Sequence, residues 1–202
     1  IAVNLPLVNS SDTNGSDIIA YNLEIQNPQN GHFVNVIKYS VQNEIIINSE
    51  IQKSIGVFIQ KGNIYRLKYR VINKAGFSDY SNIINILAAE KPETPKKPIL
   101  KNNTNSSITI ELDQNVDNNG SEILIFELYL AKPANIYDFS ATFEKVAAYN
   151  SDNSVPLSSP GSFTLLADTF GLVEGNYYLL KYLAKNNLGS SEFSEVLKIK
   201  LI

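Results

Sequence analysis

The chain has 202 residues, 44% of them apolar, and its 17 basic and 20 acidic residues leave a net charge of −3. A chain with this charge lacks the basic surplus that binds nucleic acid or anionic membranes, and no apolar run approaches the roughly 20 residues of a transmembrane helix. Because there is no cysteine, disulfides, a thiol nucleophile and thiolate metal sites are excluded, although this does not decide the compartment. The length suits two domains of about 100 residues, each able to bury a core.

The first part of the chain predicts short strands separated by turn residues. Pro6 lies inside the first of them and cannot donate to a ladder, so this strand should lie at a sheet edge or a bulge. A loop at 9–17 and the Asn-Pro-Gln-Asn-Gly turn at 27–31 interrupt the series. The expected strands are 2–8, 18–26, 32–40, 43–47 and 54–60.

The stretch from Tyr65 to Ser81 carries the strongest pattern in this half. Large apolar residues alternate with Arg66, Lys68 and Arg70 over 65–71, which is typical of an antiparallel strand with one buried face. Turn residues follow at 73–76, where the glycine tolerates a positive φ. Another strand is expected after them, reaching to about residue 88.

A proline-rich segment, EKPETPKKP, occupies residues 90–98. Its three prolines favour an extended, semi-rigid connection, so we expect a linker here between domains at 1–89 and 99–202, and a rod-like arrangement of the two. The second half then predicts strands at 99–101 and 162–169, and its longest irregular part is expected at 132–160.

The two halves repeat one another. Residues 65–81 and 178–194 both read Y-x-L-x-Y-x(3)-N-x(2)-G-x-S-x-[YF]-S, with a constant offset of 178 − 65 = 113. The Asn-Gly pairs at Asn14 and Asn119 give an offset of 119 − 14 = 105, so the second copy is longer in its middle by 113 − 105 = 8 residues. A fixed offset over many positions indicates an internal repeat.

Each copy resembles a fibronectin type III domain. The segments Ile59-x-x-Gly62-x-x-Tyr65 and Leu172-x-x-Gly175-x-x-Tyr178 are similar to the family signature at the E–F corner, which implies that Tyr65 and Tyr178 are its tyrosine corners. The resemblance implies an all-β fold of two immunoglobulin-like β-sandwiches in tandem. The Asn-, Ile-, Lys- and Tyr-rich style is similar to repeats of ciliate-like protists.

The same resemblance indicates two departures from the family pattern. The tryptophan usual in strand B is absent, and Leu7 and Leu112 occupy its place in the alignment. Ile1 corresponds to Ser106, because 106 − 1 = 105, so the first copy is expected to lack strand A. Strand B of that copy is then an exposed edge, and both ends of the chain resemble joints in a longer array.

The sequence offers little for catalysis. His32, the single histidine, lies in a predicted hairpin, and no phosphate-binding, zinc-protease or dinucleotide-binding motif is present. Loop carboxylates at Asp12/Asp17 and Asp113/Asp117/Glu122 do not have the EF-hand spacing that would favour calcium. We therefore expect neither an enzyme nor a cofactor or metal site.

Five Asn-x-Ser/Thr triplets are candidate N-glycosylation sites. Because asparagine and serine are common here, the number alone is weak evidence. Asn14 and Asn119 also belong to Asn-Gly turns, whereas the others have no evident turn role. The candidates are Asn9, Asn14, Asn102, Asn105 and Asn119.

Three functional hypotheses follow. The first is a structural or adhesive repeat of a longer extracellular or cell-surface glycoprotein, such as a fibre subunit that assembles through tandem or strand-addition contacts. The second is a protein- or glycan-binding module that uses exposed aromatics, with Tyr137, Phe139 and Tyr149 as candidates. The third is an intracellular ciliary or cytoskeletal scaffold. The expected partners are proteins or further copies in an array, with glycan as an option and without nucleic acid or direct membrane insertion.

Overall fold

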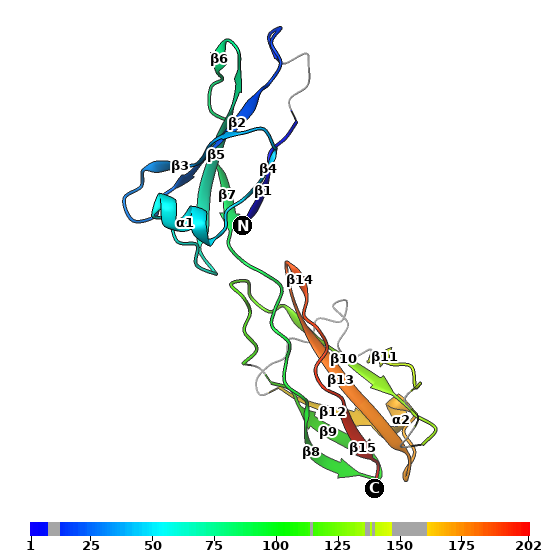
Figure 1. Cartoon of the computed structure of the whole chain (residues 1–202). Helices are drawn as coiled ribbons and strands as arrows, with labels where there is room; N and C mark the ends of the chain where they lie inside the picture. Colours follow the sequence, from blue (N-terminus) through cyan, green and yellow to red (C-terminus); the bar gives the residue numbers. More distant parts are fainter. Residues whose placement is uncertain (8–12, 114, 136–137, 139, 147–160) are drawn as a thin grey trace. The chain divides into compact units, whose positions relative to one another are not determined.

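The computed structural model describes residues 1–7, 13–113, 115–135, 138, 140–146 and 161–202. The chain divides into two compact units, Ile1–Ala89 and Glu90–Ile202, each built almost entirely of antiparallel strands (Figure 1). Within the described part of the chain, no helix has the length and apolar character needed to span a membrane.

The first unit contains one five-stranded and one two-stranded sheet. In the larger sheet β2 and β5 are central, β3 pairs with β2, and both β6 and β7 pair with β5. β1 pairs with β4 in the smaller sheet, with Val3 opposite Ile45. The elements are β1 Ala2–Asn4, β2 Ala20–Gln26, β3 Phe33–Ser40, β4 Glu44–Ile46, α1 Ser49–Ile55, β5 Ile64–Asn73, β6 Gly76–Phe77 and β7 Ile84–Leu87.

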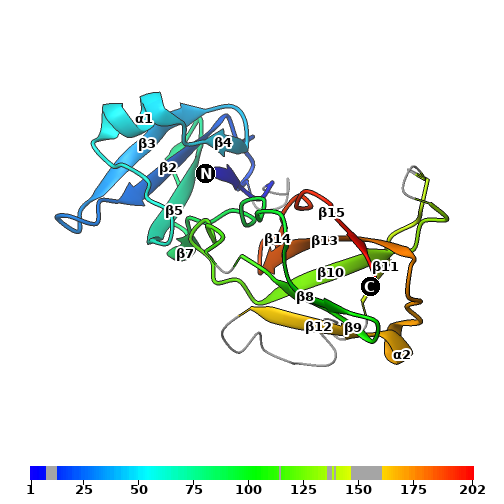
Figure 2. The ribbon, with the colours of Figure 1, turned by 90° about the horizontal axis from the view of Figure 1, so that it is seen from below.

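The second unit repeats this plan with one more strand. β10 and β13 are central in its five-stranded sheet, and β9 lies between β12 and β8 in a three-stranded sheet (Figure 2). The elements are β8 Ile99–Thr104, β9 Ser107–Glu111, β10 Ile125–Ala131, β11 Glu144–Lys145, β12 Ser162–Leu166, α2 Ala167–Phe170, β13 Tyr177–Asn186, β14 Gly189–Ser190 and β15 Leu197–Lys200.

Each unit has its own hydrophobic core between its two sheets. In the first unit Leu23, Ile25 and Leu67 are at most 1% exposed, and in the second unit Leu128 and Leu180 are fully buried. Alternate residues of each strand supply these side chains, because successive side chains of a strand point to opposite faces. The cores are separate clusters, so each unit has the means to fold by itself.

The strand expected at 54–60 is wrong. Residues 49–55 form α1, which begins because the Asn48 side chain accepts a hydrogen bond from the amide of Ile51 and ends at Gly56, whose φ is 68°. Ile51 and Ile55 pack against the core from one face of this helix. In the second unit the strand expected at 162–169 ends at Leu166, where α2 begins.

The expected equivalence of Leu7 and Leu112 also needs correction. Leu112 is 2% exposed, but Leu7 is 76% exposed. β1 ends at Asn4, and Pro6, which cannot donate to a ladder, precedes Leu7. Leu5, 4% exposed, provides the last buried side chain of this segment.

The proline-rich segment 90–98 differs from the linker that its composition predicts. It belongs to the second unit, and its three prolines Pro92, Pro95 and Pro98 are buried. Backbone hydrogen bonds attach it to the turn before β10, from Glu90 N to Asn119 O at 3.0 Å and from Glu93 N to Asp117 O at 2.9 Å. The second compact unit therefore starts at residue 90.

Candidate interaction surface

The repeated tyrosines hold the corner that precedes β5 and β13. The Tyr65 hydroxyl donates to Phe58 O at 3.1 Å and accepts from Gln60 N at 2.8 Å. The Tyr178 hydroxyl accepts from Val173 N at 2.6 Å and donates to Val173 O at 3.3 Å. Both rings are 2% exposed, so each hydroxyl satisfies backbone groups at the core boundary.

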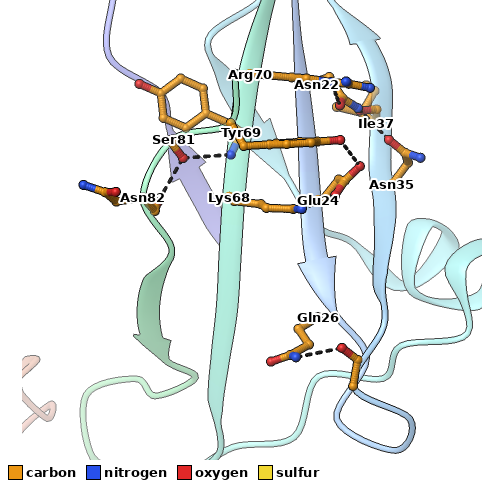
Figure 3. Close-up of polar contacts among 12 residues, drawn as sticks. Asn22, Glu24, Gln26, Asn35, Ile37, Lys68, Tyr69, Arg70, Ser81 and Asn82 are labelled. Carbon is orange, nitrogen blue, oxygen red and sulfur yellow. Dashed lines mark hydrogen bonds and ion pairs between the residues drawn. The ribbon is translucent and has the colours of Figure 1, made fainter. Parts of the chain in front are cut away.

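The serines of the repeated motif complete the backbone hydrogen bonding of β5 and β13. In the first unit Ser81 Oγ accepts from Tyr69 N at 3.0 Å and donates to Asn82 O at 3.0 Å (Figure 3). In the second unit Ser194 Oγ accepts from Tyr182 N at 3.1 Å and Ser191 Oγ accepts from Ala184 N at 3.0 Å. Each of these hydroxyls is therefore bonded to the backbone of its own unit.

Cations and aromatic rings interleave on the outer face of the larger sheet in the first unit. Lys68 Nζ lies 4.4 Å from the ring centre of Phe33 and 3.8 Å from that of Tyr80. Arg70 Cζ lies 4.6 Å from the Tyr80 ring and 4.0 Å from the Phe77 ring. All these distances lie within the range of cation–π attraction. We call Phe33, Lys68, Tyr80, Arg70 and Phe77 the cation–aromatic ladder.

Polar side chains of the neighbouring strand β2 bond to members of the ladder. Glu24 is 8% exposed, lies 3.3 Å from Lys68 Nζ and accepts a 2.6 Å hydrogen bond from Tyr80. Desolvation, together with this bond to the carboxylate, raises the pKa of Tyr80. Arg70 Nε donates to Asn22 Oδ1 at 2.9 Å, and Asn22 Nδ2 donates to Asn35 Oδ1 at 2.6 Å (Figure 3).

The second unit builds the same face with different partners. Lys181, which matches Lys68 at the offset of 113, lies 4.1 Å from the Phe143 ring and 4.0 Å from the Phe193 ring. Tyr129 meets Phe193 edge to face, with ring centres 5.0 Å apart. In both units, therefore, cations of the protein itself lie over aromatic rings of this face.

Glu127 is the buried charge of this second face. It is 5% exposed, and its carboxylate lies 2.8 Å from Lys145 Nζ and 3.3 Å from Lys185 Nζ. Burial acts to raise the pKa of Glu127, but the hydrogen bonds from Lys145, Tyr129 and Lys185 outweigh it and hold the pKa below its ordinary value.

Repeated asparagines join the turns at one end of each unit. Asn73 Nδ2 donates to Thr13 O at 3.3 Å and Ser16 O at 3.4 Å, and Asn73 Oδ1 caps its own turn. Asn186 makes the corresponding bonds at 3.2 Å and 3.4 Å and adds a shorter one of 2.7 Å to Glu90 O. The Asn-Gly turns opposite them have a positive φ of 51° at both Asn14 and Asn119.

The candidate glycosylation sites differ in accessibility. Asn14, Asn102 and Asn105 are exposed, and Asn9 lies outside the described residues. Asn119 is 3% exposed, and its Nδ2 donates to Lys91 O at 2.8 Å. The folded unit leaves no room for a glycan on that nitrogen, so Asn119 is removed from the candidates.

Among the residues that the structure describes, the remaining candidates do not come together in a chemical site. His32 is exposed next to a turn. The described residues contain no group of three or more His, Asp or Glu side chains that could hold a metal ion. Asp113 lies 3.4 Å from Lys96 Nζ, and Asp12 lies outside the described residues. Tyr137, Phe139 and Tyr149 also lie outside them.

The sequence comparisons return no match, whereas the structures do. No protein-family model and no curated protein matches the chain. The structure of the chicken CNTN1 FN1–FN3 domains is similar with a TM-score of 0.50 and 14% identity, over 96% of this chain and 59% of that one. The chain therefore spans less than two thirds of that structure. The twitchin kinase region from C. elegans (Fn31-NL-kin-CRD-Ig26) has a TM-score of 0.42 and 18% identity, over 55% and 17%.

At 14% sequence identity, the similarity to the chicken domains shows a shared fold and nothing further. The fold in question is all-β, with two sandwiches that follow one another along the chain. The resemblance expected from the repeated motif is confirmed: the chain has the tandem fibronectin type III fold.

Proposed function

We propose that this chain is a structural and adhesive repeat of a longer extracellular or cell-surface protein, that it has no catalytic role, and that it assembles through tandem or strand-addition contacts. The observation that carries the proposal is that charged and hydroxyl side chains of both units are bonded within the protein itself. In both units the lysines, the buried glutamate and the motif serines bond to one another and to the backbone. Such a face provides stiffness and a regular surface.

The tandem fold supports the same proposal, because a sandwich whose copies follow one another suits a spacer or an array. The tyrosine corners Tyr65 and Tyr178, which we propose as structural residues, rigidify the strand entry of each copy through two hydroxyl bonds. The exposed triplets at Asn14, Asn102 and Asn105 suit a chain that passes through the secretory route.

The location is tested on protein from its natural source. Its intact mass is measured before and after enzymatic removal of N-glycans, and intact cells are labelled with a membrane-impermeant amine reagent. We expect mass loss and surface labelling. Labelling only after lysis, with no mass loss, would contradict the surface location and favour the intracellular scaffold.

A protein-binding module is the second candidate, and one observation favours it. Tyr39 is 57% exposed, and Phe77, a member of the ladder, is 47% exposed; their ring centres lie 6.4 Å apart. Exposed aromatic pairs are frequent anchors of interfaces. Loss of a captured partner on Tyr39→Ser, with unchanged unfolding, would select this function over a purely structural one.

A further inference from the structure

The two units differ in charge on the outer face of their larger sheets. Arg66 and Arg70 of β5 lie on that face, and at the offset of 113 their counterparts in β13 are Leu179 and Leu183. Both leucines are at most 9% exposed, whereas Arg66 is exposed and Arg70 is half-buried. The second unit pairs its central strands in the same way with leucine at both positions, so the strand pairing does not require the arginines.

The guanidinium of Arg70 is held in one orientation by its neighbours. Its Nε donates to Asn22 Oδ1 at 2.9 Å, and Asn22 is fully buried and bonded to Asn35 Oδ1 at 2.6 Å (Figure 3). The Cζ atom lies 4.0 Å from the ring centre of Phe77 and 4.6 Å from that of Tyr80. A guanidinium that is already fixed loses little conformational entropy when it binds an anion.

The terminal nitrogens of this guanidinium have no partner within the described part of the chain. Nη1 and Nη2 of Arg70 take no part in the hydrogen bonds there, and neither Arg70 nor Lys38 forms an ion pair with a described carboxylate. Glu24, the acidic side chain that β2 places on this face, is already bonded to Lys68 and Tyr80. Two parallel N–H groups of an arginine match the two oxygens of a carboxylate. Arg70 therefore offers a fixed positive charge with donors to spare.

Exposed aromatic rings continue from the arginine. Phe77 is 47% exposed, and its ring centre lies 6.4 Å from that of Tyr39, which is 57% exposed. Lys38 Nζ lies 5.8 Å from the ring centre of Tyr39. We call Lys38, Tyr39, Arg70 and Phe77 the arginine patch. Arginine and aromatic residues are the types that contribute most to binding at protein interfaces, and here they form one continuous series of contacts.

We propose that the arginine patch binds an acidic segment of a partner polypeptide, in which a carboxylate pairs with Arg70 and a neighbouring apolar side chain packs on Tyr39 and Phe77. The charge of the patch is complementary to such a segment. A sulfated polysaccharide fits less well, because a long polyanion would also meet the field of a chain whose net charge is −3. This inference deepens the protein-binding candidate of the proposed function and rests on it.

The test uses the full chain and a fluorescent peptide, GDEFDELG, whose binding is followed by fluorescence anisotropy. We expect saturable binding that weakens as salt is added. The amide analogue GNQFNQLG should bind about tenfold or more weakly, because it has no side-chain carboxylate for the arginine. The analogue GDEADEAG keeps every charge and should lose about threefold or more, because it offers no large apolar side chain to the rings.

Three variants locate the site. Arg70→Lys keeps the charge but removes the paired donors, and should weaken binding about three- to tenfold. Lys38→Gln removes a charge of the patch at an exposed side chain and leaves the bond to Asn22 intact, so it serves even if substitution of Arg70 lowers stability. It should weaken binding about two- to threefold. Lys53→Gln removes a charge from an exposed position of α1 and should leave binding unchanged.

The outcomes that contradict the proposal are distinct. Absence of saturable binding, or equal effects of Lys38→Gln and Lys53→Gln, would show that the patch is not the site. If heparin displaces GDEFDELG and GDEADEAG binds equally well, the patch is a site for polyanions and the polypeptide partner is wrong. If a captured partner is lost on Tyr39→Ser but not on Arg70→Lys, the protein-binding candidate stands and the acidic chemistry alone is wrong. Surface labelling and glycan loss test the location separately.

Discussion

A single hydroxyl at each repeated tyrosine ties two backbone groups at the corner before the central strand. The two corners differ in detail, since Tyr65 bridges Phe58 and Gln60 whereas Tyr178 makes both bonds to Val173. Both tyrosines are only 2% exposed, so water could not easily take the place of the hydroxyl if it were removed. Tyrosine recurs at this position because its hydroxyl provides the hydrogen-bond partner that two backbone groups at the corner need.

Tyr65→Phe and Tyr178→Phe should each lower the free energy of unfolding by about 1–3 kcal/mol, because two backbone groups lose their partner. Urea unfolding monitored by circular dichroism measures this. Tyr39→Phe is the matched control, since that side chain is 57% exposed, and should stay within about 0.5 kcal/mol. A loss as large in the control would show that the corner bonds are not the cause.

Acid should weaken the second unit through Glu127. The pKa of this carboxyl in the folded state lies below its ordinary value of 4.5, so the stabilisation is complete above that value and is lost as the pH falls below it through the lowered folded pKa. Glu127→Gln should cost about 1–3 kcal/mol at pH 7, and the difference from the unsubstituted chain should shrink at about pH 3.

The control for this pH dependence is Glu195→Gln, because Glu195 is exposed. Unfolding by urea at the two pH values gives both differences. A gap between Glu127→Gln and the unsubstituted chain that stays constant on acidification would contradict the ionised carboxylate as the stabilising species.

At the scale of elements, the Gly-x-Ser-x-aromatic-Ser motif substitutes for a regular strand beside β5 and β13. Ser78 N donates to Val71 O, and Ser78 Oγ accepts from Val71 N. In the same way Ser81 N donates to Tyr69 O, and Ser81 Oγ accepts from Tyr69 N. The glycine before them has a φ of 138° in the first unit and 141° in the second, a region that favours glycine. The aromatic residue then faces outward onto the lysine of the same strand pair.

Ser194→Ala should destabilise the second unit more than Ser81→Ala destabilises the first. Ser194 is 5% exposed, so the amide of Tyr182 would be left buried without an acceptor, at about 1–3 kcal/mol. Ser81 is half-exposed, and water can reach the amide of Tyr69. Thermal unfolding of the two variants provides the comparison, and equal losses would contradict burial as the reason.

At the scale of the whole molecule, the two units have separate cores, and the proline-rich segment belongs to the second. Pro92, Pro95 and Pro98 are buried there, and Asn119 and Asn186 bond to its carbonyls. The domain bounds 1–89 and 99–202 with a linker between them therefore leave out residues that complete the second sandwich. The rod-like arrangement expected from the prolines stays a prediction.

The fragment 90–202 should unfold at a higher temperature than the fragment 99–202. Removing residues 90–98 exposes apolar surface that the prolines cover and leaves Asn119 Nδ2 without the Lys91 carbonyl. Differential scanning calorimetry of the two fragments measures this directly. Equal midpoints would mean that the segment is a linker after all.

The sequence by itself determined the repeat, the all-β class and the central strand of each unit, because period-two alternation and fixed turn residues are local signals. It failed at α1, because the apolar residues there were read as strand alternation although Asn48 and Gly56 cap a short helix. It also failed at Leu7, because the strand ends before Pro6. Only the tertiary structure decided that segment 90–98 packs against the second unit, that Asn119 is buried, and that lysines lie between rings. Those features depend on residues that are distant in sequence and meet only when the sheets form, so no local pattern records them.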